Sequence, residues 1–325
     1  DNCVFYEHMK KKKIVVIGGG MGTFTVLSGL KKYPVDLTAI VSMADDGGST
    51  GVLREEFGML PAGDVRRALV ALSSYPEKFL TDLFTYRFHE DEVDGHNFGN
   101  LILAALERVT GSFESAVAAA SHLLDVHGSV LPVTFSNVHL YAELENGEVI
   151  KGETNIDIPK HDGRLRITRL WLQPKGRANR KALKAIKDAD MVVVGPGDLF
   201  TSSIPNFLVS GMREVFRKTK AKKVYVMNLM TKYGETNDFS GIDFLSTLDH
   251  YLGAGVFDFV LVNNVRPPEQ TLRRYKKEQA EWVSYKDAEQ SKKGKLHFVK
   301  TGLLRRSNYA RHDSAKLAKA LMGIL

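Results

Sequence analysis

The 325 residues, 43% of them hydrophobic, are enough for a large buried core, and apart from Cys3 the chain has no cysteine, which excludes disulfides, zinc ribbons and thiol catalysis. The net charge of +7 would suit a nucleic acid, but no basic run is interleaved with aromatic residues, so we expect solvated surface or attraction of a small anionic ligand. No apolar run approaches the roughly 20 residues that cross a bilayer and no secretory signal is visible, so we expect a cytoplasmic protein without a membrane span.

Residues 1–8 look unlike the rest, and Met9 followed by Lys10–Lys13 is typical of a natural start, so we expect the first eight residues to be an added leader. Beyond them, short β-branched runs alternate with segments of helical periodicity. The first half of this pattern predicts strands at Lys13–Ile17 and Leu37–Val41, and helices at Met21–Lys32, Asp64–Ser73 with Asp64 as its N-cap, Glu77–Phe88, Phe98–Val109 and Ser112–Leu124.

The periodicity changes over about 129–173. Val138–Leu144 and Glu148–Glu153 alternate around Asn146-Gly147, a favoured hairpin turn, and Arg166–Leu172 alternates as well, so we predict a small antiparallel insertion. The earlier pattern then resumes. It predicts strands at Met191–Val194, Val224–Met227 and Phe257–Asn263, and helices at Arg177–Lys187, Pro205–Lys218, Gly241–Leu252 and Asp313–Leu325.

This alternation predicts an α/β fold with a doubly wound, mostly parallel sheet that carries the antiparallel insertion. No repeat and no linker rich in proline or serine divides the chain, so we expect residues 9–325 to form one domain.

Four predicted strands end in loops of small and polar residues: Gly18–Thr23, Ser42–Gly51, Gly195–Ser203 and Asn228–Thr231. Ligands of open parallel sheets bind beyond the carboxyl ends of the strands, and a glycine turn before a helix exposes N–H groups to phosphate. We therefore expect the four loops to line one pocket for a nucleotide-like ligand. In the first loop the contacts would come from Gly19, Gly20, Gly22 and Thr23, although a strand-to-helix glycine turn can also be purely structural.

The second loop contains two adjacent carboxylates, Asp45 and Asp46, that could hold ribose hydroxyls, a Mg²⁺ ion or a proton in transit. The bland alternative is an Asx turn that stabilises the loop itself. No spacing of His, Asp and Glu resembles a zinc site. Anion contacts around this loop would come from Gly47, Gly48, Ser49 and Arg54.

The remaining candidates stand at a helix start, at a polar helix entrance and in the last two loops. At the helix start, Asp64 could simply cap and Arg67 could simply face water, and a lone histidine is usually structural. The third loop would cradle an anion, and the fourth would contact a base or a sugar. These candidates are Asp64 and Arg66, His96 and Asn100, then Gly195, Pro196, Gly197 and Thr201, and finally Asn228 and Thr231.

With these motifs in order along the chain, the sequence resembles the YvcK group of the CofD-like superfamily, bacterial proteins described as gluconeogenesis factors. The resemblance rests on a series of motifs that runs from Met9 to the C-terminal helix. They are Val15–Gly20, Ala44–Ser49, Pro61–Arg66, Gly99–Leu101, Gly195–Gly197, Asn228–Thr231 and Arg311-His312.

The resemblance implies a Rossmann-like three-layer α/β/α fold and a bound nucleotide sugar of the UDP-N-acetylglucosamine type. It also implies that Tyr275 and Arg311 contact this ligand and that the protein links carbon metabolism to cell-wall synthesis and cell shape, without turnover and without a required cofactor. Archaeal relatives that transfer phospholactate in coenzyme F420 synthesis lack the run Asp45–Ser49, which favours the regulatory branch.

Two other functions stay open. One is a transferase on a nucleoside-diphosphate-linked substrate, with Asp45 or Asp46 holding Mg²⁺ as the catalytic candidates. The other is an NAD-binding protein, supported only by the first glycine loop and weakened because Thr23 stands where the Gly-x-Gly-x-x-Gly pattern has its third glycine. The sequence leaves open a homo-oligomer, partners among cell-wall-synthesis proteins, and the base and sugar of the ligand.

Overall fold

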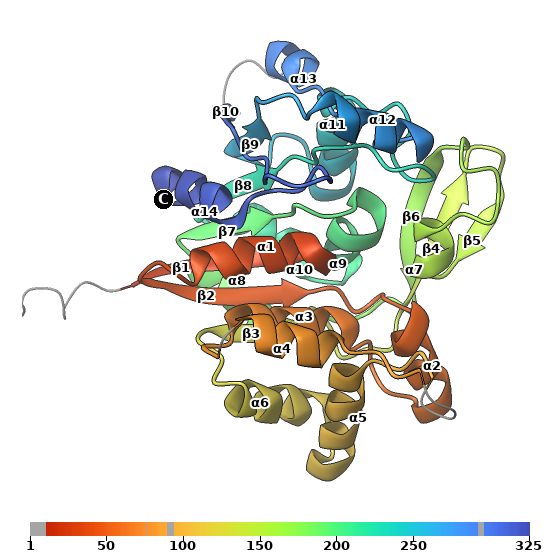
Figure 1. The fold of residues 1–325 in the computed structure, drawn as a ribbon, viewed down its shortest axis with the longest axis vertical. Helices are drawn as coiled ribbons and strands as arrows, with labels where there is room; N and C mark the ends of the chain where they lie inside the picture. The colour runs from red at the N-terminus through yellow and green to blue at the C-terminus, as the bar shows by residue number, and fades with distance from the viewer. Residues whose placement is uncertain (1–10, 76, 90–93, 292–295) are drawn as a thin grey trace, which may run out of the picture.

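In a computed structural model, residues 11–75, 77–89, 94–291 and 296–325 are described; the expected leader, 1–8, lies outside them. The centre of the molecule is a seven-stranded, wholly parallel sheet with strand order β10-β9-β8-β7-β1-β2-β3 (Figure 1). Its strands are β1 (Lys12–Gly18), β2 (Val35–Val41), β3 (Ser129–Pro132), β7 (Met191–Val194), β8 (Lys222–Val226), β9 (Phe259–Asn263) and β10 (His297–Thr301).

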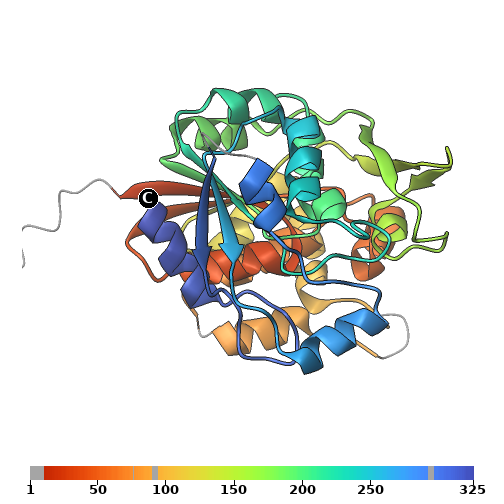
Figure 2. The same cartoon turned by 90° about the horizontal axis from the view of Figure 1, so that it is seen from above.

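Helices cover both faces of this sheet, which is why its central strands are continuous apolar runs rather than alternating ones. Ile14–Ile17 of β1 and all of β7 are buried. One face carries α1 (Gly20–Leu30), α3 (Gly63–Leu72) and α14 (Ser314–Ile324), with α1 packed against both of the others. The opposite face carries α8 (Arg180–Asp188), α9 (Pro205–Leu208), α10 (Met212–Lys218) and α11 (Gly241–Leu252) (Figure 2).

The direction of strand addition reverses between β1 and β7. From β1 the chain adds β2 and β3 on one side, whereas from β7 it adds β8, β9 and β10 on the other. At such a reversal the connections from two neighbouring strands leave toward opposite faces of the sheet, so a crevice opens beyond their carboxyl ends. The first and third glycine loops, which follow β1 and β7, therefore lie side by side at this crevice.

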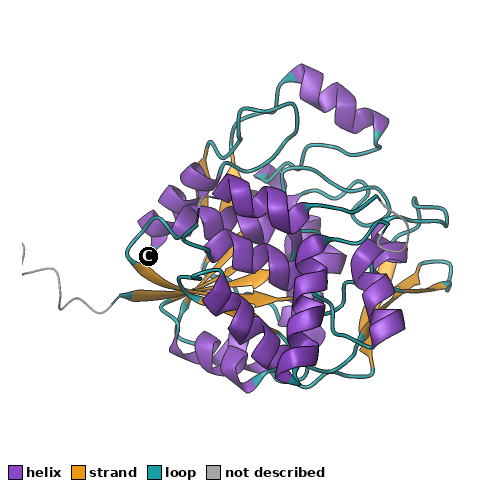
Figure 3. Ribbon diagram, turned by 60° about the horizontal axis from the view of Figure 1, so that its bottom comes forward, coloured by secondary structure: helices purple, strands orange, loops and turns teal. Residues whose placement is uncertain are grey.

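A second, antiparallel sheet of order β5-β4-β6 lies beyond the carboxyl ends of the central strands (Figures 1 and 3). It consists of β4 (His139–Leu144), β5 (Val149–Lys151) and β6 (Ile167–Gln173), with the short helix α7 (Glu153–Asp157) after β5. The remaining helices are α2 (Gly48–Phe57), α4 (Glu77–Thr85), α5 (Phe98–Thr110), α6 (Phe113–Leu123), α12 (Glu269–Lys277), α13 (Lys286–Ser291) and a π-helical turn, η2, at Leu199–Ser203.

The structure confirms the predicted α/β class and corrects four local predictions. Residues 129–132 pair in parallel with β2, so the antiparallel sheet starts only at His139. The strand expected to reach Glu153 ends at Lys151, and a helix takes over. The helix expected over Pro205–Lys218 is interrupted before Met212, where Gly211 adopts a left-handed conformation. Asp64 is not an N-cap, because α3 starts one residue earlier.

Among the helices of the described ranges, none combines the length and the apolar character that crossing a membrane requires.

Candidate functional site

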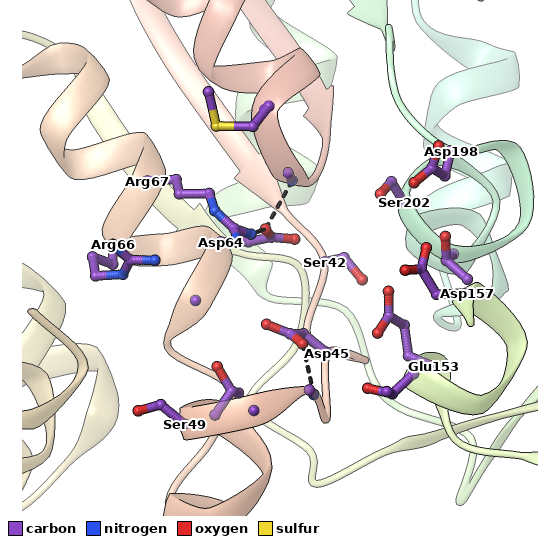
Figure 4. A pocket seen from close by; sticks show the side chains of 18 of the residues that line it. Ser42, Asp45, Ser49, Asp64, Arg66, Arg67, Glu153, Asp157, Asp198 and Ser202 are labelled. Atoms are coloured by element: carbon purple, nitrogen blue, oxygen red, sulfur yellow. Dashed lines mark hydrogen bonds and ion pairs between the residues drawn. The ribbon is translucent and has the colours of Figure 1, made fainter. Parts of the chain in front are cut away.

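A cavity of about 360 Å³, the first pocket, lies where the sequence predicted a shared site, beyond the ends of β1, β2 and β7 (Figure 4). Three of the four predicted loops contribute to it, together with α3 and α7. Its lining consists of Gly20, Met21, Ser42, Asp45, Gly47, Gly48, Ser49, Thr50, Gly63, Asp64, Arg66, Arg67, Arg87, Asn100, Glu153, Thr154, Asp157, Ile158, Asp198, Thr201 and Ser202.

Three long helices begin at the wall of this pocket. Gly20 of α1, Gly48 of α2 and Gly63 of α3 are each the first residue of their helix. The first turn of a helix leaves backbone N–H groups without an intrahelical partner, and its dipole favours negative charge nearby. The protein itself uses one of these donors, because the Gly20 N–H donates to Asp64 Oδ1 at 2.8 Å. The other N–H groups in the first turns of these three helices make this wall suited to an anionic group.

Carboxylates form much of the rest of the lining. Asp45 lies after β2 and Asp64 in the first turn of α3, and Glu153 faces them from α7 (Figure 4). Burial, followed by repulsion from Asp64, raises the pKa of Asp45 to about 6. Burial, followed by repulsion from Asp45, raises the pKa of Glu153 to about 9. Near neutral pH the Glu153 carboxyl therefore carries a proton, and Asp45 titrates close to the physiological range.

Two arginines of α3 balance part of this negative charge. Arg67 donates to Asp64 Oδ1 at 3.0 Å, and its side chain is 35% exposed. Arg66 is buried and donates to Asn100 Oδ1 at 3.0 Å and to the Phe84 carbonyl at 2.5 Å. Arg66 therefore orders the wall through protein contacts, whereas the partly exposed Arg67 can also face an incoming anion.

A second pocket of about 890 Å³ adjoins the first, and Asp157, Ile158 and Asp198 line both. Its lining includes Tyr275 of α12 and Arg311. The remaining lining is Pro159, Pro196, Gly197, Asn228, Leu229, Met230, Thr231, Lys232, Tyr233, Glu278, Ala280, Ala310 and His312. Arg311 is exposed, and its guanidinium lies 5.5 Å from the centre of the Tyr309 ring, an arrangement typical of a cation–π contact.

Most of the predicted site residues come together in these two pockets. The first contains Gly20, Asp45, Gly47, Gly48, Ser49, Asp64, Arg66, Asn100 and Thr201; the second contains Pro196, Gly197, Asn228, Thr231, Tyr275 and Arg311. Both polar side chains of the fourth loop are bonded within the protein. Asn228 donates to the Gly197 carbonyl at 2.9 Å, and the Thr231 hydroxyl accepts from the Glu281 N–H at 2.8 Å.

Four other predicted residues lie behind the lining of the two pockets. The position that a Cβ at Gly22 would occupy is 1.8 Å from the Pro196 carbonyl oxygen, so only glycine allows α1 to approach the third loop this closely. A Cβ at Gly19 would likewise lie 2.3 Å from Asp64 Oδ2. Thr23 is buried within α1, and Gly195 has a φ of +74°. These positions shape the crevice through their backbones.

Asp46 and Arg54 use their polar groups to connect the second loop to the insertion. The Asp46 carboxylate accepts the Glu153 N–H at 3.2 Å and the Thr154 N–H at 2.9 Å, so it caps the start of α7. The buried Arg54 guanidinium donates to the carbonyls of Asp45 and Val138, at 2.9 Å each, and to Asn137 Oδ1 at 2.6 Å. His96, which lines neither pocket, precedes Asn97, the residue that caps α5.

Sequence reasoning missed Glu153, Asp157 and Lys232. The first two occupy positions i and i+4 of α7, a spacing that places both carboxylates on one helix face. The sequence contains this signal, but the alternation of the preceding residues favours a strand that runs through Glu153. Lys232 Nζ contacts Asp157, Asp198 and Glu235, and those three lie 75, 34 and 3 residues away from it in sequence. Nothing in the local sequence indicates such a cluster.

The oxygen ligands of the first pocket suit Mg²⁺ only in part. Within the described residues, the group of three carboxylates close enough together to hold an ion is Asp157, Asp198 and Glu235, and Lys232 already contacts all three. Asp45 and Asp64 could supply two ligands, while Asp46 points its oxygens at α7. Mg²⁺ is often bound by one or two carboxylates plus phosphate oxygens of a ligand. A Mg²⁺ ion here would therefore arrive with a phosphorylated ligand.

Comparison with known proteins identifies close relatives. Residues 14–304 match the family model described as 2-phospho-L-lactate transferase CofD. The gluconeogenesis factor of Bacillus subtilis is 41% identical over 97% of this chain and 99% of its own length, and that of Halalkalibacterium halodurans is 39% identical over 97% of each. A crystal structure of a UPF0052 family member from Bacillus halodurans superposes with a TM-score of 0.90 at 37% identity, covering 97% of this chain and 99% of that one.

Proposed function

The chain belongs to the CofD family, among its gluconeogenesis factors, and we propose that it binds a nucleotide sugar of the UDP-N-acetylglucosamine type across the two adjoining pockets. In this proposal the protein is a regulator that reports the supply of this ligand, and so links carbon metabolism to cell-wall synthesis and cell shape. The observation that carries the proposal is the continuity of the two pockets at Asp157 and Asp198, with anion-binding helix starts in one and Tyr275 and Arg311 in the other.

The chemistry of each wall supports one part of such a ligand. In the second pocket, the Tyr275 ring and the Met230 side chain offer apolar surface to a base, and Arg311 offers a guanidinium to a phosphate. The diphosphate would lie near the junction, within reach of the helix start at Gly20. The carboxyl groups of the first pocket would accept hydrogen bonds from sugar hydroxyls. Because sugar hydroxyls are neutral donors, they match a wall with more acceptors than free cations.

The test begins with the small molecules that the purified protein retains. Mass spectrometry of a denatured sample should detect a nucleotide sugar, and calorimetry should then give a saturable isotherm with UDP-N-acetylglucosamine. UDP and N-acetylglucosamine, each titrated alone, serve as controls and should bind more weakly than the intact ligand. Saturable binding of NAD with no binding of the nucleotide sugar would overturn the proposal in favour of an NAD-binding protein.

A second candidate is a transferase acting on a nucleoside-diphosphate-linked substrate. Asp45 and Asp64 favour it, because a Mg²⁺ ion would relieve their mutual repulsion. Glu153 favours it as well, because its raised pKa lets it donate a proton near neutral pH. Bound Mg²⁺ would supply charge stabilisation at a phosphate, and Asp45 and Asp64 would hold it. Incubation with Mg²⁺ and candidate acceptors, followed by chromatography of the nucleotide fraction, tests for turnover; release of a free nucleotide would favour this candidate.

A further inference from the structure

Four charged side chains from three separate segments meet where the two pockets join. Asp157 comes from α7, Asp198 from the third loop, and Lys232 with Glu235 from the stretch after β8. Lys232 Nζ lies 2.9 Å from Asp198 Oδ2 and 3.4 Å from Glu235 Oε1, and it contacts Asp157 Oδ1 as well. One oxygen from each of the three carboxylates lies within 4.8 Å of the other two.

Glu235 anchors this cluster in the core of the molecule. Its side chain is fully buried, and it accepts hydrogen bonds from the Phe200 N–H at 3.1 Å and the Thr201 hydroxyl at 3.0 Å. Burial alone would lower the pKa of Lys232, but the charges of Glu235, Asp198 and Asp157 outweigh burial and raise it. The ammonium group therefore stays charged throughout the physiological range.

Three carboxylates at this spacing would ordinarily attract a divalent cation, because Mg²⁺ and Mn²⁺ prefer carboxylate oxygens. Here an ammonium group with three N–H donors occupies the space between three acceptors, so its geometry matches the cluster. We propose that Lys232 is a positioning residue, a tethered counter-ion that takes the place of a metal ion and holds Asp157 and Asp198 at the junction of the two pockets. This wall then keeps its shape whether or not divalent cations are present.

The proposal makes a gain-of-function prediction that does not depend on the identity of the ligand. Lys232→Met keeps most of the apolar part of the side chain and removes the ammonium group, so the three carboxylates should bind one additional Mn²⁺ ion per chain. Electron paramagnetic resonance of free Mn²⁺, titrated against wild-type and variant proteins, counts the bound ions. Lys232→Arg retains a cation and should bind no more than the wild type. In the double variant Lys232→Met/Asp198→Asn, loss of one charged ligand should weaken the additional site strongly.

Thermal unfolding provides a second readout. In EDTA, Lys232→Met should unfold at a lower temperature than the wild type, and Mn²⁺ should restore much of the difference, whereas Lys232→Arg should need no metal. A Lys232→Met protein that folds but binds no additional Mn²⁺, or that Mn²⁺ does not stabilise, would overturn the proposal. If Lys232→Met does not fold in EDTA, refolding in the presence and absence of Mn²⁺ replaces the titration, and equal failure in both would overturn it too.

The consequence for ligand binding rests on the proposed function and is measured separately. In EDTA, the affinity of Lys232→Met for UDP-N-acetylglucosamine should fall about tenfold, the scale of one misplaced hydrogen-bonding group, and Mn²⁺ should restore it. If the wild type does not bind this nucleotide sugar at all, the proposed function fails while the Mn²⁺ count still tests Lys232. If Lys232→Met binds the nucleotide sugar normally and binds no additional Mn²⁺, the inference about Lys232 fails and the proposed function stands.

Discussion

Replacing Asp45 by asparagine should stabilise the folded protein at neutral and alkaline pH. Burial, together with Asp64, raises the pKa of Asp45 from 3.8 to about 6. A carboxyl group whose pKa is higher in the folded than in the unfolded state contributes fully to stability at a pH below its unfolded-state pKa. This contribution is lost as the pH rises through its folded-state pKa. A gap of about two pH units at about 1.4 kcal/mol each means that the ionised carboxylate costs the folded state about 3 kcal/mol above about pH 7.

Asparagine cannot ionise, yet its amide oxygen can still accept the Gly47 N–H that now donates to Asp45 Oδ1 at 3.0 Å. The variant should therefore keep the turn without the destabilisation that ionisation of the buried carboxyl group causes. Half of this cost is already present at about pH 5, so the advantage of Asp45→Asn over the wild type should grow by about 1.5 kcal/mol between pH 5 and pH 8.

Urea denaturation at the two pH values measures this difference as a change in the free energy of unfolding. Asp36→Asn, at an exposed position on β2, is the matched control and should show no such trend. The reasoning is refuted if the advantage of Asp45→Asn is the same at both pH values, or if the variant is the less stable protein at pH 8.

Three further substitutions separate binding from architecture. Arg311→Ala should fold normally, because the side chain is exposed, and its nucleotide-sugar affinity measured by calorimetry should fall about ten- to a hundredfold. Arg213→Ala, at an exposed position on α10, is the control and should keep the wild-type affinity. An unchanged affinity of Arg311→Ala would remove Arg311 from the site. Asp46→Ala should destabilise the protein by about 1–2 kcal/mol through the lost cap of α7, with Asp46→Asn closer to the wild type; equal loss in both would contradict a capping role. Gly22→Ala should cost about 3 kcal/mol in urea denaturation, because its Cβ would overlap the Pro196 carbonyl oxygen, and an unchanged midpoint would refute that packing argument.

The sheet and the position of the site followed from the sequence because both depend on local patterns. Met191–Val194 is a short apolar run ended by glycine, and the structure has a strand at the same residues. The purposes of individual polar side chains were harder to predict. Asp64 looked like a local helix cap, yet its carboxylate accepts from Gly20 on another helix. Arg54 looked like a phosphate ligand, yet its hydrogen bonds go to the loop and the insertion.

The missed residues share a physical cause. A contact between groups far apart along the chain is decided by how the strands and helices pack, and hydrophobic periodicity carries no information about which polar ends then meet. The cluster around Lys232 brings together positions 157, 198, 232 and 235, which only the three-dimensional fold makes neighbours. The site was therefore predictable as a place, while its electrostatics required the tertiary structure.

Those electrostatics bear on whether the protein binds or transforms its ligand. A diphosphate placed deep in the first pocket would face Asp45 and Asp64, and repulsion would oppose it unless a divalent cation came with it. At the junction of the pockets, Lys232 offsets the charges of Asp157 and Asp198, and the same diphosphate would lie near Arg311 and the helix start at Gly20, so repulsion would be weaker there. Metal-independent binding would thus place the diphosphate at the junction, out of reach of the Asp45 and Glu153 carboxyls, as expected for a regulator. Binding that requires Mg²⁺ would place it against those carboxyl groups, as a transferase requires.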